Sequence, residues 1–179
     1  MQTAPLLVRP SSLADVGAIR DIYALAVTLG TGTFELEAPD LAEMARRRDD
    51  VLAKGLPWLV AEQDGQLLGY AYANHFRPRP AYRFSVEDSI YLHPEAQGRG
   101  LGRVLLAELV ARCQAAGARQ MLAVIGDSAN AASVGVHQAL GFERCGLLQS
   151  VGWKFGRWLD VVLMQRPLGA GSAAPGGAA

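Results

Sequence analysis

Apolar positions recur along the chain in two periods, one typical of helices and the other typical of strands. The spacing of an amphipathic helix first occurs at Val16, Ile19, Ile22, Tyr23 and Ala26. Ser12 or Asp15 precedes this run as a candidate cap, and a second, more polar helix is expected at about 41–54. The stretch GRVLLAELVARCQAAG predicts a third, amphipathic helix that ends at Gly117.

Strands are predicted by apolar runs that turn residues separate. LLVRP (6–10) is a short opening strand, and WLVAEQDGQLLGYAYANHF is expected to form a hairpin around Asp64-Gly65. FSVEDSIYL and QMLAVIG predict further strands, while the prolines of RPRPAY exclude a regular strand just before FSVEDSIYL. A short helix and the start of a strand lie within SANAASVGVHQALGFE, and residues 151–165 supply a last pair of strands. Strands mixed with helices in this way indicate an α/β (α+β) fold with a single sheet.

Length and composition favour one globular domain. The chain has 179 residues, of which 50% are hydrophobic and 19% charged. This suits one sizeable core better than two. The stretch GAGSAAPGGAA lacks core residues, so we expect the domain to span 1–168 and residues 169–179 to be a disordered tail.

The charge balance argues against several classes of partner. Seventeen basic residues balance seventeen acidic ones, so nothing global points to nucleic acid or to a membrane surface. No apolar run approaches the length of a membrane span, and MQTAPLLVRP lacks the features of a signal peptide. A cytoplasmic protein is therefore expected, in which any anion is bound by a local arrangement.

The two cysteines carry no predicted chemistry. Cys113 and Cys145 have no His or Cys partner at metal-binding spacing. We expect both to be small buried residues rather than a disulfide, a metal site or a nucleophile.

A glycine-rich stretch, Gln97-Gly98-Arg99-Gly100-Leu101-Gly102, lies between a strand and the start of the third helix. Glycines let the backbone turn tightly, and the first N–H groups of a helix are unpaired, so this place suits a phosphate. The alternative is a tight turn with solvent-facing arginines at 99 and 103. A P-loop would need Gly-Lys-Ser/Thr at residues 101–103, which are Leu-Gly-Arg here. The glycine spacing also differs from the dinucleotide-binding pattern G-x-G-x-x-G, so neither motif matches.

The same stretch fits Q/R-x-x-G-x-G/A, the pyrophosphate loop of the GNAT superfamily of N-acetyltransferases, through Gln97, Gly100 and Gly102. The sequence resembles that superfamily also in IYLHP before the loop, in SANAASVGVHQALGFE and in the order of its elements. AYRFSVEDSIYLHPEAQGRGLG and VGWKFGRWLD are similar to stretches of its phosphinothricin and methionine sulfoximine acetyltransferase branch. The resemblance covers roughly residues 5–167.

This resemblance implies a single-domain GNAT fold, with about four helices flanking a mixed, mostly antiparallel sheet. It implies direct transfer, in a ternary complex, of an acetyl group from acetyl-CoA to the amine of a small amino-acid-like substrate, without a metal. The donor-binding residues that it implies are Ile90, Tyr91, Leu92, Gln97, Gly98, Arg99, Gly100, Leu101, Gly102, Arg103 and Asn130. The strand can offer its backbone to acetyl-CoA only if the sheet splays there, and Asn130 could also be an ordinary helix cap.

Transfer to an amine needs a general base, because an ammonium has no lone pair. Glu87, just before the donor-binding strand segment, is the candidate catalytic base, and the alternative is a solvated strand carboxylate. Asp88 should point to the opposite face if the strand is regular. His137 stands where the superfamily motif has the tyrosine that commonly protonates the leaving thiolate. It could supply that proton, act as a base, or be a packed residue.

The resemblance also implies contacts to an acceptor with a carboxylate, for which the planar fork of arginine is suited. The candidate acceptor-binding residues are Phe34, Arg77, Pro78, Arg79, Arg83, Glu87, Asp88 and Ser89. At least one of the three arginines is expected to be an ordinary surface residue. Phe34 either covers the acceptor or anchors its own loop.

The sequence also leaves open other acceptors and a CoA-binding function without catalysis. The acceptor could be a protein N-terminus, a ribosomal protein or a polyamine, but Phe34 and the arginine loop favour a covered pocket over an open groove. A CoA-binding module without turnover would lack the base that Glu87 offers. Trp153, Phe155 and Trp158 are expected to build core or a dimer face, and together with the resemblance they indicate a homodimer.

Overall fold

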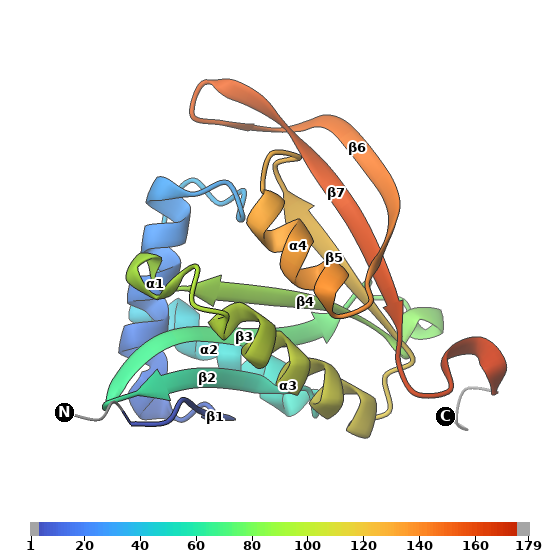
Figure 1. Ribbon diagram of the computed structural model, residues 1–179, viewed down its shortest axis with the longest axis horizontal. Helices are drawn as coiled ribbons and strands as arrows, with labels where there is room; N and C mark the ends of the chain where they lie inside the picture. Colours follow the sequence, from blue (N-terminus) through green and yellow to red (C-terminus); the bar gives the residue numbers. More distant parts are fainter. Residues whose placement is uncertain (1–3, 175–179) are drawn as a thin grey trace.

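The computed structural model describes residues 4–174, and its elements follow the order expected from the sequence (Figure 1). The strands are β1 (Leu7–Pro10), β2 (Trp58–Gln63), β3 (Gln66–His75), β4 (Ser85–Leu92), β5 (Gln120–Gly126), β6 (Glu143–Lys154) and β7 (Arg157–Pro167). The α-helices are α1 (Val16–Leu29), α2 (Leu41–Ala53), α3 (Leu101–Ala115) and α4 (Ala131–Ala139).

All strands belong to one seven-stranded sheet with the order β1-β2-β3-β4-β5-β7-β6. Neighbouring strands are antiparallel except β4 and β5, which run parallel. The predicted mixed, mostly antiparallel sheet is thereby confirmed. Asp64 and Gly65 turn the β2–β3 hairpin with φ angles of 52° and 75°, the positive values expected of a tight two-residue turn.

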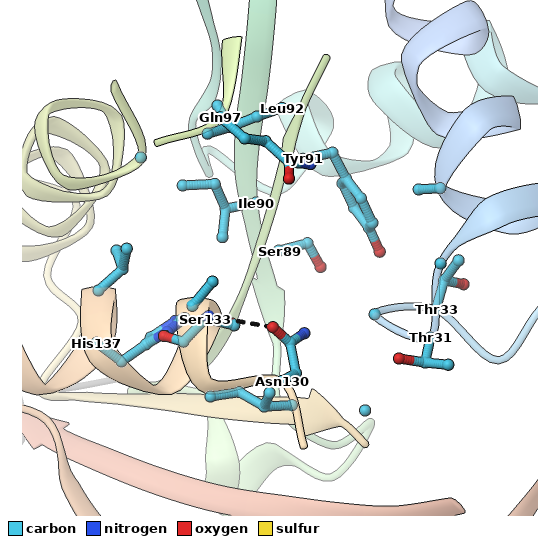
Figure 2. A pocket seen from close by; sticks show the side chains of 18 of the residues that line it. Thr31, Thr33, Ser89, Ile90, Tyr91, Leu92, Gln97, Asn130, Ser133 and His137 are labelled. Atoms are coloured by element: carbon cyan, nitrogen blue, oxygen red, sulfur yellow. Dashed lines mark hydrogen bonds between the residues drawn. The ribbon is translucent and has the colours of Figure 1, made fainter. Parts of the chain in front are cut away.

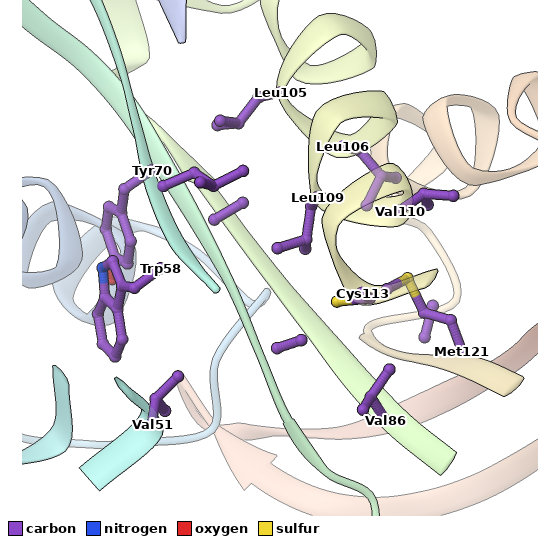
Figure 3. Packing of buried hydrophobic residues seen from close by; sticks show 14 of the residues in the cluster. Val51, Trp58, Tyr70, Val86, Leu105, Leu106, Leu109, Val110, Cys113 and Met121 are labelled. Atoms are coloured by element: carbon purple, nitrogen blue, oxygen red, sulfur yellow. The ribbon is translucent and has the colours of Figure 1, made fainter. Parts of the chain in front are cut away.

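Helices cover both faces of the sheet, and each face has its own set of buried side chains (Figures 1 and 3). On the face of α1 and α2, Trp58 and Tyr70 are buried and their rings are stacked. On the other face, Leu105 and Leu109 of α3 are fully buried, and Cys113 lies beside Met121 (Figure 3). No helix within residues 4–174 combines the length and the apolar character that a bilayer crossing needs.

The pairing between β4 and β5 is short. β4 pairs with β5 only from Ser85 to Asp88, opposite Gln120 to Ala123, whereas its pairing with β3 continues to Leu92. Beyond Asp88 the two parallel strands separate. The splay that exposure of the β4 backbone requires is therefore present, and it frees the β5-facing side of residues 89–92.

The last hairpin differs from its prediction in extent. The strand start expected at the end of SANAASVGVHQALGFE and the first strand expected after residue 151 form one strand, β6, and two register shifts interrupt its pairing with β7. Nearly all of β6 is exposed because it is the edge strand of the sheet. Cys145 lies on this strand and is exposed, so the expectation that it is buried was wrong, while Cys113 is buried as expected.

Residues 169–174 of the expected tail lie within the described part of the chain. Leu168, the last residue of the expected domain, is buried, and Gly171–Ala173 form a 3-10 turn. The backbone N–H of Gly169 donates to the side chain of Gln114 in α3, at 3.1 Å. Residues 175–179 of the expected tail lie outside the described residues.

Candidate active site

A cavity of about 990 Å³ opens where β4 and β5 separate. Its walls are the segment 29–33 after α1, residues 87–92 of β4, the glycine loop, the end of β5 and the first turns of α4. Figure 2 shows Ile90 and Tyr91 pointing to opposite sides of β4, so the cavity borders both faces of the strand.

The glycine loop turns into α3 through two residues in the left-handed region. Gly98 has φ 71°, and Gly100, which caps α3, has φ 79°. A side chain at either position would meet nothing within 4 Å, so backbone conformation rather than space favours glycine here. The unpaired N–H groups at the start of α3 therefore face the cavity at a place that suits an anion.

All candidate donor-binding residues except Arg99 line this cavity. Arg99 is exposed, and its guanidinium donates to the side-chain oxygen of Gln63 at 2.9 Å. Asn130 caps α4, since its Oδ1 accepts from the N–H of Ser133 at 3.2 Å (Figure 2). That cap uses only the oxygen, so the Asn130 amide N–H groups can donate to a ligand at the same time.

Glu87 lies at the last part of the β4–β5 ladder, half-buried, and lines the cavity. Burial raises the pKa of Glu87, the charge of Asp88 raises it further, and the guanidinium of Arg77 partly offsets both. A carboxylate with a raised pKa accepts a proton more readily than an ordinary glutamate. Ser89, two residues further along the same face, also lines the cavity.

Asp88 points to the opposite face of β4, as a regular strand predicts, and meets His137 of α4. The two side chains are each 2% exposed, and Asp88 Oδ2 lies 3.0 Å from His137 Nε2. The other ring nitrogen, Nδ1, is 2.7 Å from the backbone oxygen of Ser133. Asp88 Oδ1 is buried and has no hydrogen-bond partner among residues 4–174. Neither ring nitrogen of His137 is therefore free in this arrangement.

This geometry determines how many protons the Asp88–His137 pair holds. A carbonyl oxygen only accepts, so Nδ1 of His137 carries a hydrogen, and a second proton must lie between Nε2 and Asp88. Burial lowers the pKa of His137, but the hydrogen bond and charge of Asp88 outweigh it and the net shift is upward. The arrangement corresponds to an imidazolium paired with a carboxylate inside the protein.

The arginine loop and Phe34 lie outside the wall of the cavity. Arg77, Pro78, Arg79 and Arg83 are exposed, and no ion pair to them occurs among the described residues. Arg77 is nevertheless close enough to act on the charge of Glu87. Phe34 packs on Gly126 and Gly152, which is the anchoring role rather than the covering one.

Sequence reasoning missed the part of the wall that follows α1. Thr31, Gly32 and Thr33 line the cavity, and so does Tyr72, which stacks on Trp58 with ring centroids 4.1 Å apart. TLGTGTFELEAPD is recognisable as a loop from its glycines and its proline, but nothing in it indicates which surface it covers. In the described part of the chain, no group of three His, Cys, Asp or Glu residues could hold a metal ion.

Comparisons with known proteins agree with this geometry. The model of the acetyltransferase (GNAT) family matches residues 19–142. The chain is 59% identical over 157 residues to phosphinothricin N-acetyltransferase from Alcaligenes faecalis, over 88% of this chain and 80% of that protein. It is 41% identical over 169 residues to L-methionine sulfoximine/L-methionine sulfone acetyltransferase from Pseudomonas aeruginosa, over 94% and 98% of the two chains. The crystal structure of a phosphinothricin acetyltransferase from Sinorhizobium meliloti in complex with acetyl-CoA superposes with a TM-score of 0.93, at 50% identity and over 96% and 93% of the chains.

The Asp88–His137 pair leads to a prediction about protonation. The His137 ring should stay doubly protonated above its ordinary pKa of 6.5, and Asp88→Asn should lower that pKa because burial, the largest influence, is then opposed only by the hydrogen bond to the Ser133 backbone. The pair's contribution to the free energy of unfolding is fully present below about pH 6.5 and is lost as pH rises through the raised folded-state pKa. Ring ¹⁵N chemical shifts and urea unfolding across pH measure both effects. A His137 ring that titrates alike in the two proteins would contradict the prediction.

Proposed function

The chain belongs to the acetyltransferase (GNAT) family, and from this premise we propose that it acetylates the amino group of small amino-acid-like substrates. Phosphinothricin, methionine sulfoximine and methionine sulfone are the acceptors named for its relatives. The observation that carries the proposal is the cavity between β4 and β5, which is lined both by the glycine loop at the start of α3 and by the half-buried carboxylate of Glu87. Acetyl-CoA is the donor, and because it is made and used inside cells we propose a cytoplasmic reaction.

The residues of the cavity fit acetyl-CoA. The glycine loop offers the N–H groups at the start of α3 to a pyrophosphate, with Arg103 beside it. The β5-facing backbone of residues 89–92 has no strand partner and can bond a pantetheine arm, as can the amide of Asn130. When bound, acetyl-CoA supplies an acetyl group activated as a thioester.

Glu87 is the general base in this proposal. It takes a proton from the acceptor ammonium, directly or through water, so that the amine can form its bond to the acetyl carbon. The raised pKa of Glu87 supports the role, since a base works best when its pKa approaches the working pH. Ser89 faces the same part of the cavity and is available to bond the acceptor.

In this proposal His137 is not immediately free to protonate the leaving thiolate. Both its ring nitrogens are engaged, one by Ser133 and one by Asp88. The pair holds a proton at the wall of the cavity, and the leaving thiolate can receive it only if the ring releases one of these contacts. Asp88 is accordingly a partner of His137 here rather than a contact of the acceptor.

The exposed arginines form the proposed entrance for a carboxylate. Arg77, Arg79 and Arg83 carry positive charge on the exposed segment that precedes β4, and no carboxylate of the described residues forms an ion pair with them. Of the three, Arg77 is the strongest candidate contact because it acts on Glu87. Closure of the loop on a bound acceptor would bring the guanidinium to the carboxylate.

An acceptor panel tests the substrate class. Methionine sulfoximine, methionine sulfone, phosphinothricin, free amino acids, a polyamine and an N-terminal peptide are each incubated with acetyl-CoA, and release of free thiol is measured. We expect turnover with the first three. Activity only on the polyamine or the peptide would replace the proposed acceptor, and acetyl-CoA binding without any acceptor-dependent thiol release would favour a binding module.

Replacement of the base gives a second test. Glu87→Gln should lower kcat by about 10²–10⁴-fold with little change in the affinity for acetyl-CoA. In the wild type, kcat/KM should fall with decreasing pH at a pKa above the ordinary 4.5 of glutamate, because the carboxylate must be ionised to act. Steady-state kinetics across pH and calorimetric titration measure these quantities. Glu143→Gln, an exposed carboxylate on β6, is the control, and unchanged turnover in Glu87→Gln would remove Glu87 from the mechanism.

We also propose that the chain forms a homodimer through the β6–β7 hairpin. Trp153, Phe155 and Trp158 are 56%, 54% and 60% exposed, so these aromatic residues do not build the core of one chain. Leu147, Leu148 and Val151 add to the same exposed hairpin. A large apolar surface of this kind is typical of an interface.

Replacement of the two tryptophans tests the dimer. Trp153→Ser with Trp158→Ser should convert the mass of two chains to that of one chain in light scattering coupled to size exclusion, with unchanged circular dichroism. Leu13→Ser removes an exposed leucine elsewhere and should leave the dimer intact. A wild-type protein that runs as one chain would refute the proposal.

A further inference from the structure

The loop after α1 is held in place by the C-terminal hairpin, and we propose that Lys154 of β6 is a positioning residue for the acceptor. In this inference, Lys154 fixes residues 30–34 as the wall of the cavity at the end that receives the amine. The identity of the acceptor in this inference rests on the proposed function, whereas the fixed position of residues 30–34 does not.

Lys154 makes two hydrogen bonds that span the wall segment. Its ammonium donates to the backbone oxygens of Gly30 and Thr33, each at 2.8 Å, and the residue is only 3% exposed. Thr31 and Gly32, which lie between these two carbonyls, line the cavity. A buried ammonium that lost its acceptors would be costly, so the lysine and the loop hold each other in this arrangement.

Phe34 makes a second connection between the loop and the sheet. Its ring lies so close to Gly152 of β6 that a Cβ there would overlap the ring, and a Cβ at Gly126 of β5 would come within 2.8 Å of it. The Gly126 Cβ would also overlap the backbone oxygen of Thr31. Space alone therefore requires glycine at both positions.

The pattern of β6 supports a role outside the core. Gly152 and Lys154 are buried, whereas Val151 and Trp153 on the alternate positions, and Phe155 in the turn that follows, are exposed. An edge strand normally buries its apolar side chains and exposes its charged ones, so this order is reversed. The inward positions of the strand serve the loop instead of a hydrophobic core.

A hydrogen bond from α1 also holds the loop, on the side of the cavity where we propose that the acceptor binds. The hydroxyls of Tyr23 and Thr33 are 2.9 Å apart, and the Tyr23 ring packs edge to face on Tyr91 at 5.0 Å. This places residues 30–33 on the face of β4 that also carries Glu87 and Ser89. Figure 2 shows Thr31 and Thr33 across the cavity from the strand. The glycine loop that would hold the donor lies past the carboxyl end of β4.

Lys154→Met tests the inference because it keeps the apolar stem and removes the ammonium. KM for the acceptor should rise by about tenfold or more, from loss of hydrogen bonds to a charged donor. The dissociation constant for acetyl-CoA should change by less than about twofold. Hydrogen–deuterium exchange of residues 30–34 should accelerate in the protein without ligands. A purely structural role would instead change the two affinities together.

Gly152→Ala gives an independent arm, with Gly146→Ala as its matched control. Both glycines lie on β6, but a Cβ at Gly146 would meet Leu163 at an ordinary 3.4 Å. Gly152→Ala should displace Phe34 and reproduce the kinetic and exchange changes of Lys154→Met, while Gly146→Ala should behave as wild type. This arm decides the question even if Lys154→Met does not fold.

Unchanged acceptor KM and unchanged exchange of 30–34 in these variants would overturn the inference, as would an equal loss of acetyl-CoA affinity. Failure of the proposed function looks different, because the wild type would then acetylate none of the carboxylate-bearing acceptors. The exchange measurement needs no ligand, so it would still decide whether Lys154 fixes the loop.

Discussion

The early end of the β4–β5 ladder is the constraint on which the rest of the structure depends. Two parallel neighbours in a sheet normally satisfy each other's backbone groups, and here they stop doing so after Asp88 and Ala123. The freed side of β4 needs a partner that is itself strand-like, and the pantetheine arm of acetyl-CoA has the amides for that. The glycine loop, α3 and α4 surround this opening, and in the proposed complex the donor completes a sheet that the described residues leave unfinished.

The opening also divides the chemistry between the two faces of one strand. Glu87 and Ser89 lie on the face of β4 where we propose that the acceptor binds, while Asp88 faces α4 and contacts the ring of His137. Two carboxylates that are adjacent in sequence thus have different surroundings. One is half-buried beside an arginine, and the other is fully buried against a histidine. The negative charge of Asp88 raises the pKa of Glu87, so the buried pair contributes to the basicity of the carboxylate on the other face.

Local patterns predicted most of the elements and the glycine-rich turn into α3, because a helix period, a strand period and a cluster of glycines each occur in consecutive residues. The contacts across the fold could not be predicted in this way. Asp88 and His137 are 49 positions apart, and their alternation and spacing only place each on a face. Arg99 belongs to the loop motif but donates a hydrogen bond to Gln63, and the motif does not indicate which partner an exposed guanidinium contacts. Lys154 bonds Gly30 and Thr33, which lie 124 and 121 positions earlier, and the reversed burial of β6 becomes visible only once the strand is placed at the edge of the sheet.

The β6–β7 hairpin connects the proposed binding of the acceptor with the proposed formation of the dimer. The buried residues of its edge strand β6 are a glycine and a lysine, so side-chain burial contributes little to the stability of that strand, whereas β7 buries Leu159, Val162 and Met164 in the core. Besides its backbone pairing with β7, the strand β6 is held by the loop on one side and, in the proposed dimer, by the surface that covers its aromatic residues on the other. Binding events that order the same element are coupled, and that coupling is reciprocal. An acceptor that stabilises residues 30–34 would therefore also favour association of the hairpins, and association would favour binding of the acceptor.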